Sequence, residues 1–150
     1  LFRQGSAAAI GERSPTALVY QNQGWFDGAA QPPDSPRDAD ILSLEDLHAY
    51  ASALTRNGFF GPNSWYMNHA ANALYAAQGL NGGRIEAPVL FIAARYDSTC
   101  DAVHSALAEP MRGLCTHLTE AVIDSGHWMA QEKPMEVNYH LVRWLMQAVL

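Results

Sequence analysis

Two stretches decide the fold: VLFIAARYD, residues 89–97, and DSGHW, residues 124–128. The first opens with an apolar run that has no polar alternation, as expected of a strand buried on both faces. A second β-rich stretch, residues 118–123, leads into DSGHW. Polar residues, Asp97 and His127, therefore follow two successive predicted strands. In parallel sheets the loops beyond the carboxyl ends of the strands hold the ligand site, so both residues are candidates for chemistry.

Helical patterns alternate with these strands, which indicates parallel β-α units and an α/β fold class. One helix is predicted over residues 100–109, and another begins at Pro134, a residue that suits the first turn of a helix. Two strands cannot make a complete sheet, so this part of the chain needs further strands from elsewhere. The predicted apolar stripe of the last helix comprises Val137, Leu141, Trp144, Leu145 and Val149.

The upstream part has a different pattern and divides from the strands near residues 80–87. Residues 1–40 are predicted to be rich in loops, with at most one short helix, and contain the cluster QPPDSP. A helix is predicted to start at Ser43, with Asp46 completing a capping box, and to stop at Gly58. A second helix is predicted from Asn63 or Ser64 to Ala77.

Composition narrows the class of function. The net charge of −6 argues against a nucleic-acid surface, and hydrophobic residues at 49% fit a globular protein. The longest apolar runs are too short to span a bilayer, so no membrane association is predicted. Cys100 and Cys115 lack metal-ligand spacing, which favours reduced thiols in a cytoplasmic protein. No metal is predicted.

Asp97 and His127 have the order of the last two members of a catalytic triad, in which the nucleophile comes earlier in the chain. The aspartate would fix the tautomer of the histidine and stabilise its protonated form. The alternative is structural: Asp97 caps the following helix and His127 is an ordinary loop histidine. The spacing alone leaves both interpretations open.

The stretch GHWMAQEKP, residues 126–134, resembles the histidine loop of soluble epoxide hydrolases of the α/β-hydrolase fold, fungal members among them. NGFFGPNSWY, residues 57–66, resembles the cap segment of that family, and AARYD, residues 93–97, its acid loop. The resemblance implies a helical cap over residues 1–83 and the C-terminal part of the hydrolase core over residues 84–150.

The resemblance also implies roles. His127 would be the base that activates water, Asp97 would orient it, and Tyr66 would donate a hydrogen bond to the epoxide oxygen. Trp65 and Trp128 would line the substrate site. The expected partners are a small apolar epoxide and water, a homodimer is left open, and no cofactor is implied.

The family nucleophile is an aspartate on a strand-to-helix turn, and none of the upstream aspartates has that setting. We therefore expect a missing N-terminal half of the core to carry it, and the chain to be inactive without that half. Two alternatives stay open: another α/β hydrolase, such as a haloalkane dehalogenase or esterase, and a non-catalytic remnant that binds small apolar ligands.

Overall fold

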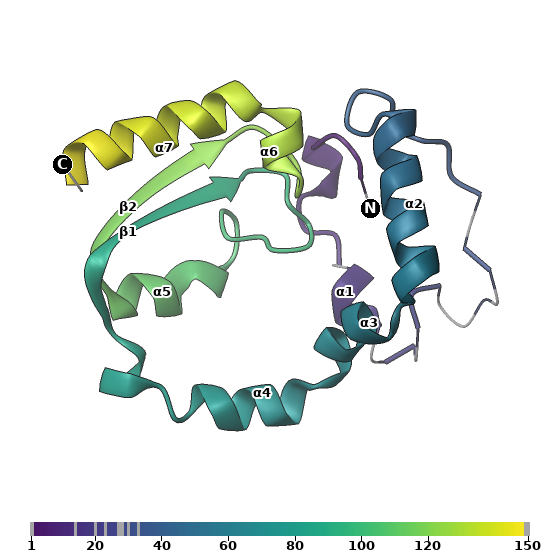
Figure 1. Cartoon of the computed structure of the whole chain (residues 1–150). Helices are drawn as coiled ribbons and strands as arrows, with labels where there is room; N and C mark the ends of the chain where they lie inside the picture. Colours follow the sequence, from purple (N-terminus) through teal and green to yellow (C-terminus); the bar gives the residue numbers. More distant parts are fainter. Residues whose placement is uncertain are drawn as a thin grey trace.

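The computed structural model describes residues 2–13, 15–19, 21–22, 24–26, 29, 31–32 and 34–148. Two parallel strands lie beside a long C-terminal helix, and further helices complete an open arrangement (Figure 1). The elements are η1 (Ala7–Ala9), α1 (Pro15–Leu18), α2 (Leu44–Asn57), α3 (Phe60–Met67), α4 (His69–Ala76), η2 (Leu80–Gly83), β1 (Ile85–Ala94), η3 (Ala106–Ala108), α5 (Glu109–Leu114), β2 (Cys115–Ile123), α6 (Met129–Glu132) and α7 (Pro134–Ala148), where η marks short 3-10 helices.

The two strands confirm the predicted β-α pattern. Each begins earlier than the apolar run from which it was predicted, β1 at Ile85 and β2 at Cys115. They pair in parallel from Val89 with Leu118 to Ala94 with Ile123. The pairing continues past their ends, because the backbone N–H of Tyr96 donates to the carbonyl of Ser125 at 3.0 Å. The loops that carry the candidate residues are therefore held side by side.

A helix lies on each side of this strand pair and covers part of it. Helix α7 contacts both strands and α5 contacts β2, and Figure 1 shows the two helices on opposite sides of the pair. The buried core between β1 and α5 is small and made largely of alanines. It comprises Ala93, Ala102 and Ala108, with Phe91, Val103 and Met111 packed against them.

Helix α2 has the predicted ends. The Ser43 side chain accepts from the backbone N–H of Asp46, and the Asp46 side chain accepts from the backbone of Ser43, which forms the capping box. Gly58 follows the last turn with φ 73°, a conformation that favours glycine, and its N–H donates to the carbonyl of Leu54.

The single helix predicted up to Ala77 is wrong in two respects. Helix α3 starts earlier, at Phe60, which places Pro62 in its first turn, where a proline costs no hydrogen bond. The helical path also breaks at Asn68, whose φ of −100° and ψ of 28° are not helical. The Asn68 side chain donates to that of Asn72, within α4, at 3.2 Å.

The helix predicted over residues 100–109 is also wrong. The Asp101 carboxylate accepts from the backbone N–H of His104 at 2.8 Å, and the Ser105 hydroxyl from the N–H of Leu107 at 3.2 Å. Such side-chain acceptors compete with helical hydrogen bonds and favour turns. The helix begins only at Glu109, with Pro110 in its first turn.

The predicted stripe of α7 is partly right. Val137 and Trp144 are half-buried, whereas Leu141 and Leu145 stay 42% and 39% exposed. Val149 lies outside the described residues. His140, which the predicted stripe omits, lies with Trp144 over Leu90 and Ala121 around a pocket of about 190 Å³.

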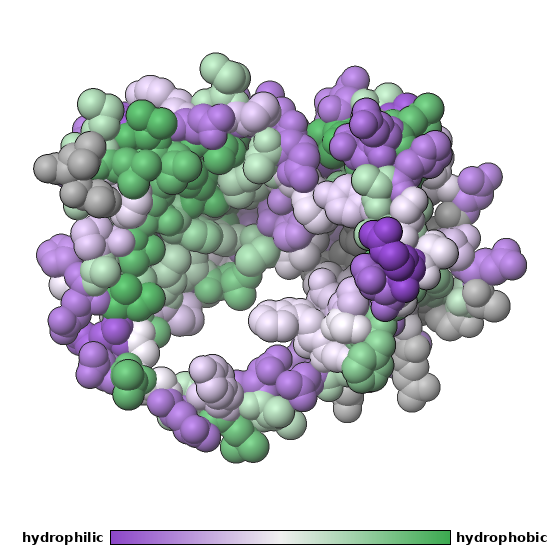
Figure 2. Space-filling view, viewed as in Figure 1, coloured by the Kyte–Doolittle hydropathy of each residue, from purple (hydrophilic) through white to green (hydrophobic). Residues whose placement is uncertain are grey.

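Much apolar surface near the strands remains uncovered. Figure 2 shows hydrophobic side chains gathered over the part of the molecule that holds the strands and α7. Ile85 on β1 and Val122 on β2 are 46% and 43% exposed. Strands of this composition are normally covered on both faces, which agrees with the prediction that further strands complete the sheet.

Candidate active site

Asp97 is placed by the end of β1 and held by its own loop. Its side chain is 9% exposed. Oδ1 accepts hydrogen bonds from the backbone N–H of Thr99 at 2.8 Å and of Cys100 at 3.0 Å. These bonds fix the carboxylate and keep it supplied with donors, as a buried charge requires.

The same carboxylate meets His127. The Nδ1 atom of His127 lies 3.1 Å from Oδ1 and 3.0 Å from Oδ2 of Asp97. Asp97 therefore accepts from the backbone of its own loop, without capping a helix there, and the same carboxylate also contacts His127. A proton on Nδ1 that is donated to Asp97 would leave the lone pair of Nε2 free to accept a hydrogen bond. The His127 side chain is 45% exposed, so it is accessible from solvent.

The loop that carries His127 is tied down on both sides. Ser125 is fully buried. Arg95, at the end of β1, donates to Asp124 at 2.5 Å, and both side chains of this pair are well exposed, so it contributes little to stability. The backbone pairing past the strand ends is therefore the stronger restraint.

Glu132 is a site residue that sequence reasoning missed, because its pattern fits a solvated charge at the start of a helix. Its carboxylate is partly buried and accepts from the backbone N–H of Gly126 at 2.8 Å. It also accepts from the N–H of Gly5, at 3.1 and 3.2 Å to its two oxygens. No local signal could have found a contact with the far end of the chain.

Trp128 lies beside His127. Its ring meets that of His127 edge-on, with centroids 5.5 Å apart. On its other side it stacks on Phe2 at 4.2 Å, and Phe2 in turn contacts Tyr50 of α2 at 5.1 Å. Trp128 therefore joins the histidine loop to the first residues of the chain and to the upstream helices.

Tyr66 and Trp65 lie on α3, away from this cluster. The ring of Tyr66 meets that of Trp25 edge-on at 4.9 Å. This edge-on contact with Trp25 is a packing contact that helps to place the Tyr66 ring.

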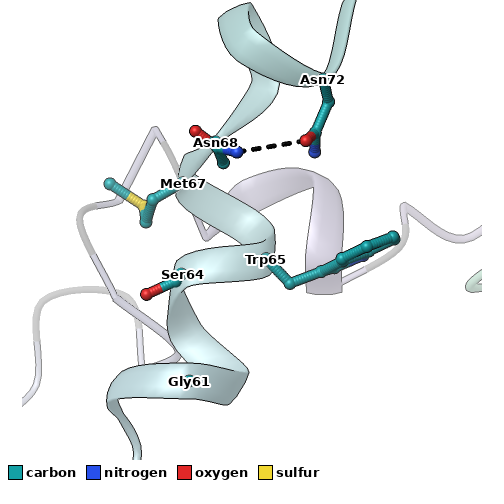
Figure 3. Close-up of a pocket in the computed structure, with 6 residues that line it drawn as sticks. All are labelled: Gly61, Ser64, Trp65, Met67, Asn68 and Asn72. Carbon is teal, nitrogen blue, oxygen red and sulfur yellow. Dashed lines mark hydrogen bonds between the residues drawn. The ribbon is translucent and has the colours of Figure 1, made fainter. Parts of the chain in front are cut away.

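Trp65 lines a pocket of about 560 Å³ with Gly61, Ser64, Met67, Asn68 and Asn72. Figure 3 shows its ring projecting to the side of the helix opposite Ser64 and Met67. The ring is exposed, and the lining of this pocket includes neither Asp97 nor His127. The structure brings Asp97, His127 and Trp128 together but leaves Trp65 and Tyr66 on a separate helix.

The surroundings of Asp97 also change the pKa of a nearby thiol, that of Cys100. Partial burial raises the pKa of Cys100, and the negative charges of Asp97 and Asp101 raise it further. Among the described residues, no group of three or more His, Cys, Asp or Glu side chains is arranged to hold a metal ion. None of the described helices is both long and apolar enough to cross a membrane.

Known proteins with similar sequences and folds indicate how the placement of Asp97 and His127 at neighbouring strand ends can be interpreted. The chain matches no protein-family model. It is 32% identical over 131 residues to bifunctional epoxide hydrolase 2 of Sus scrofa, which covers 87% of this chain and 22% of that protein. It is 34% identical over 128 residues to epoxide hydrolase A of Mycobacterium tuberculosis, with 81% and 36% covered.

The chain is thus similar in sequence to part of two epoxide hydrolases. Among solved structures, epoxide hydrolase A from Mycobacterium thermoresistibile superposes with a TM-score of 0.62 and 31% identity, over 83% of this chain and 37% of that one. A Vigna radiata epoxide hydrolase variant gives 0.62 and 27%, over 77% and 38%. The fold is that of the C-terminal portion of an α/β hydrolase, and the chain spans 22% and 36% of the two curated relatives.

Proposed function

We propose that this chain is the acid-and-base part of a longer epoxide hydrolase, which adds water to a small apolar epoxide and releases a vicinal diol. The observation that carries the proposal is the pairing of Asp97 with Nδ1 of His127 at the ends of two neighbouring parallel strands. The names of the related proteins supply the substrate class.

The reaction has two covalent steps. In the first, an aspartate carboxylate from a segment of the enzyme outside residues 1–150 attacks a ring carbon of the epoxide. The carbon–oxygen bond of the ring breaks, an ester forms between enzyme and substrate, and the ring oxygen takes a proton from Tyr66. A phenol suits this role because it stabilises the developing alkoxide by donating to it.

In the second step, Nε2 of His127 removes a proton from water while Asp97 stabilises the imidazolium. The resulting hydroxide attacks the carbonyl carbon of the ester, the acyl–oxygen bond breaks, and the diol leaves with the aspartate carboxylate regenerated. The proton held by His127 returns through solvent to the Tyr66 phenolate, so epoxide and water are fully accounted for in the diol.

Residues 1–83 would form part of the cap over this site and residues 84–150 part of the core. Trp128 would line the substrate site beside the base, where its ring already meets that of His127. Trp65 would contact the substrate from the cap, which is supported by its exposure and by the pocket it lines. The chain alone would lack turnover because the nucleophile lies elsewhere.

The test is epoxide turnover by the full-length enzyme with Tyr66→Phe and with Tyr75→Phe. Tyr75 on α4 is 80% exposed and is a matched control for loss of a phenol. Tyr66→Phe should lower epoxide turnover by about 100- to 1,000-fold, the effect of removing one donor to a developing oxyanion. Tyr75→Phe should leave it near the wild-type rate.

Turnover of haloalkanes or esters separates this proposal from its alternatives. If those substrates were processed faster than epoxides and Tyr66→Phe left their turnover unchanged, another α/β-hydrolase activity would be the better assignment. Binding of epoxide or diol without turnover at any enzyme concentration would support a non-catalytic protein.

A further inference from the structure

Glu132 makes the contact in this region that the proposed mechanism does not yet use. It is the last residue of α6, five positions after His127 in the sequence, and its side chain is partly buried. Oε2 accepts from the N–H of Gly126, the residue directly before His127, at 2.8 Å. Both oxygens also accept from the N–H of Gly5. Hydrogen bonds to a charged acceptor are shorter and stronger than neutral ones.

The two glycines that share this carboxylate are in direct backbone contact. A Cβ atom on Gly5 would lie 2.2 Å from the nitrogen of Gly126 and 2.4 Å from the carbonyl carbon of Ser125. A Cβ atom on Gly126 would lie 3.0 Å from the Cα and the nitrogen of Gly5. The contact therefore leaves no room for side chains, and Glu132 is the group that satisfies the backbone donors on both sides of it.

The segment held in this way reaches the base by a second route. Phe2 stacks on Trp128 at 4.2 Å and contacts Tyr50 of α2 at 5.1 Å. The Glu132 carboxylate thus holds the backbone of Gly126, directly before His127. It also holds Gly5, and Phe2 in the same N-terminal segment supports the ring of Trp128, directly after His127. A shift of the loop at Gly126 would change the direction of the His127 ring relative to Asp97.

We propose that Glu132 is the positioning residue for the base, and that it acts on hydrolysis of the covalent ester and not on its formation. This inference rests on the proposed function, in which His127 serves only the second step. Ring opening depends on the nucleophile and on Tyr66, whereas the hydrogen bonds of the Glu132 carboxylate go to the backbone of Gly5 and of Gly126, next to His127.

The experiment measures the two steps separately in the full-length enzyme, by rapid quenching and mass analysis of the ester in a single turnover. The variants are Glu132→Ala, Glu132→Gln and His127→Gln. Glu136→Ala is the matched control, because Glu136 is an exposed acidic residue in the first turn of α7. It removes the same charge without touching the loop.

Glu132→Ala should slow ester hydrolysis by roughly 10- to 100-fold, the effect of a small misplacement of a catalytic group, and leave ester formation near the wild-type rate. Glu132→Gln keeps one oxygen acceptor and should recover part of the loss. Glu136→Ala should match the wild type in both steps. Accumulation of the ester in both Glu132 variants, with more ester in Glu132→Ala than in Glu132→Gln, supports the inference.

Equal slowing of both steps in the Glu132 variants, or no change in either, would overturn it. Should Glu132→Ala fail to fold, Glu132→Gln decides, because the inference predicts slower hydrolysis with unchanged formation there too. The His127→Gln variant distinguishes a failure of the proposed function from a failure of the role assigned to Glu132. If it leaves hydrolysis intact, the proposed function is wrong; if it blocks hydrolysis while Glu132→Ala behaves as wild type, only the role of Glu132 is wrong.

Discussion

Asp97 contacts Nδ1 of His127 through both of its carboxylate oxygens, at 3.1 and 3.0 Å, across the ends of two paired parallel strands. The strand register and the hydrogen bond from Tyr96 to Ser125 hold the two loops together. The parallel pairing of β1 and β2 thus brings Asp97 and His127 together at one edge of the strand pair.

Asp97→Asn should impair the reaction without disturbing the loop. The asparagine oxygen can still accept from the N–H groups of Thr99 and Cys100, but the negative charge that stabilises the imidazolium is lost. Turnover in the full-length enzyme should fall on the order of 10³- to 10⁴-fold, as for triads that lose this charge. Steady-state kinetics measure the fall, and thermal unfolding should show little change.

Asp124→Asn is the control for this substitution. Asp124 lies in the adjoining loop, is 64% exposed and pairs with Arg95 at 2.5 Å. An exposed pair is worth about 0–1 kcal/mol, so turnover should stay near the wild-type rate. If Asp97→Asn and Asp124→Asn had similar small effects, the pairing of Asp97 with His127 would have no part in catalysis.

Gly5→Ala should destabilise the enzyme. The added Cβ would meet the backbone of Ser125 and Gly126 at 2.4 and 2.2 Å, and backbone cannot move aside as a flexible side chain can. Overpacking of this kind costs about 1–3 kcal/mol or more. Thermal unfolding of the full-length enzyme should show the loss as a lower Tm.

Gly113→Ala provides the comparison. Gly113 lies in α5, and a Cβ there would meet no atom within 4 Å. Alanine is favoured over glycine in helices by up to about 1 kcal/mol, so Tm should be unchanged or higher. A Tm for Gly5→Ala equal to that of Gly113→Ala would show that the two glycine segments do not touch as described.

The thiol of Cys100 should react slowly with alkylating reagents at neutral pH. Partial burial and the charges of Asp97 and Asp101 raise its pKa, and the thiolate is the reactive form. The alkylation rate of Cys100 should therefore rise with pH around a midpoint higher in the folded protein than in the denatured one. Site-resolved mass analysis over a pH series measures both midpoints.

Asp97→Asn should move the folded midpoint of Cys100 towards lower pH, because it removes one of the two negative charges that disfavour the thiolate. Asp124→Asn, which changes no charge that acts on this thiol, should leave the midpoint in place. A folded midpoint at or below the denatured one would contradict the described surroundings of Cys100.

The elements that the sequence predicts well are those with local signals. The capping box of Ser43 with Asp46 and the stop at Gly58 depend on residues within a few positions of each other, and α2 has these ends. The strand ends at Asp97 and His127 follow from two short apolar runs. Because neighbouring parallel strands end at the same edge of a sheet, the sequence alone predicts that Asp97 and His127 lie close together.

The features that escaped prediction depend on competition or on distance in the chain. Asp101 and Ser105 accept backbone hydrogen bonds that replace the predicted helix with turns. The break at Asn68 has no proline or glycine to mark it. The hydrogen bond from the Gly5 N–H to the Glu132 carboxylate joins residues 127 positions apart, which no local pattern can reveal. The exposed position of Trp65 depends on how α3 and α4 meet.

The mass of the full-length His127→Gln enzyme, after mixing with a small excess of epoxide, tests the role of His127 most directly. We expect a stable adduct, heavier than the free enzyme by the mass of the epoxide, and negligible diol, because ester formation does not need the base and hydrolysis does. His48→Gln, an exposed control on α2, should show turnover and no lasting adduct. Rapid diol formation by His127→Gln, with no adduct, would contradict the assignment of His127 as the base and of Asp97 as its partner.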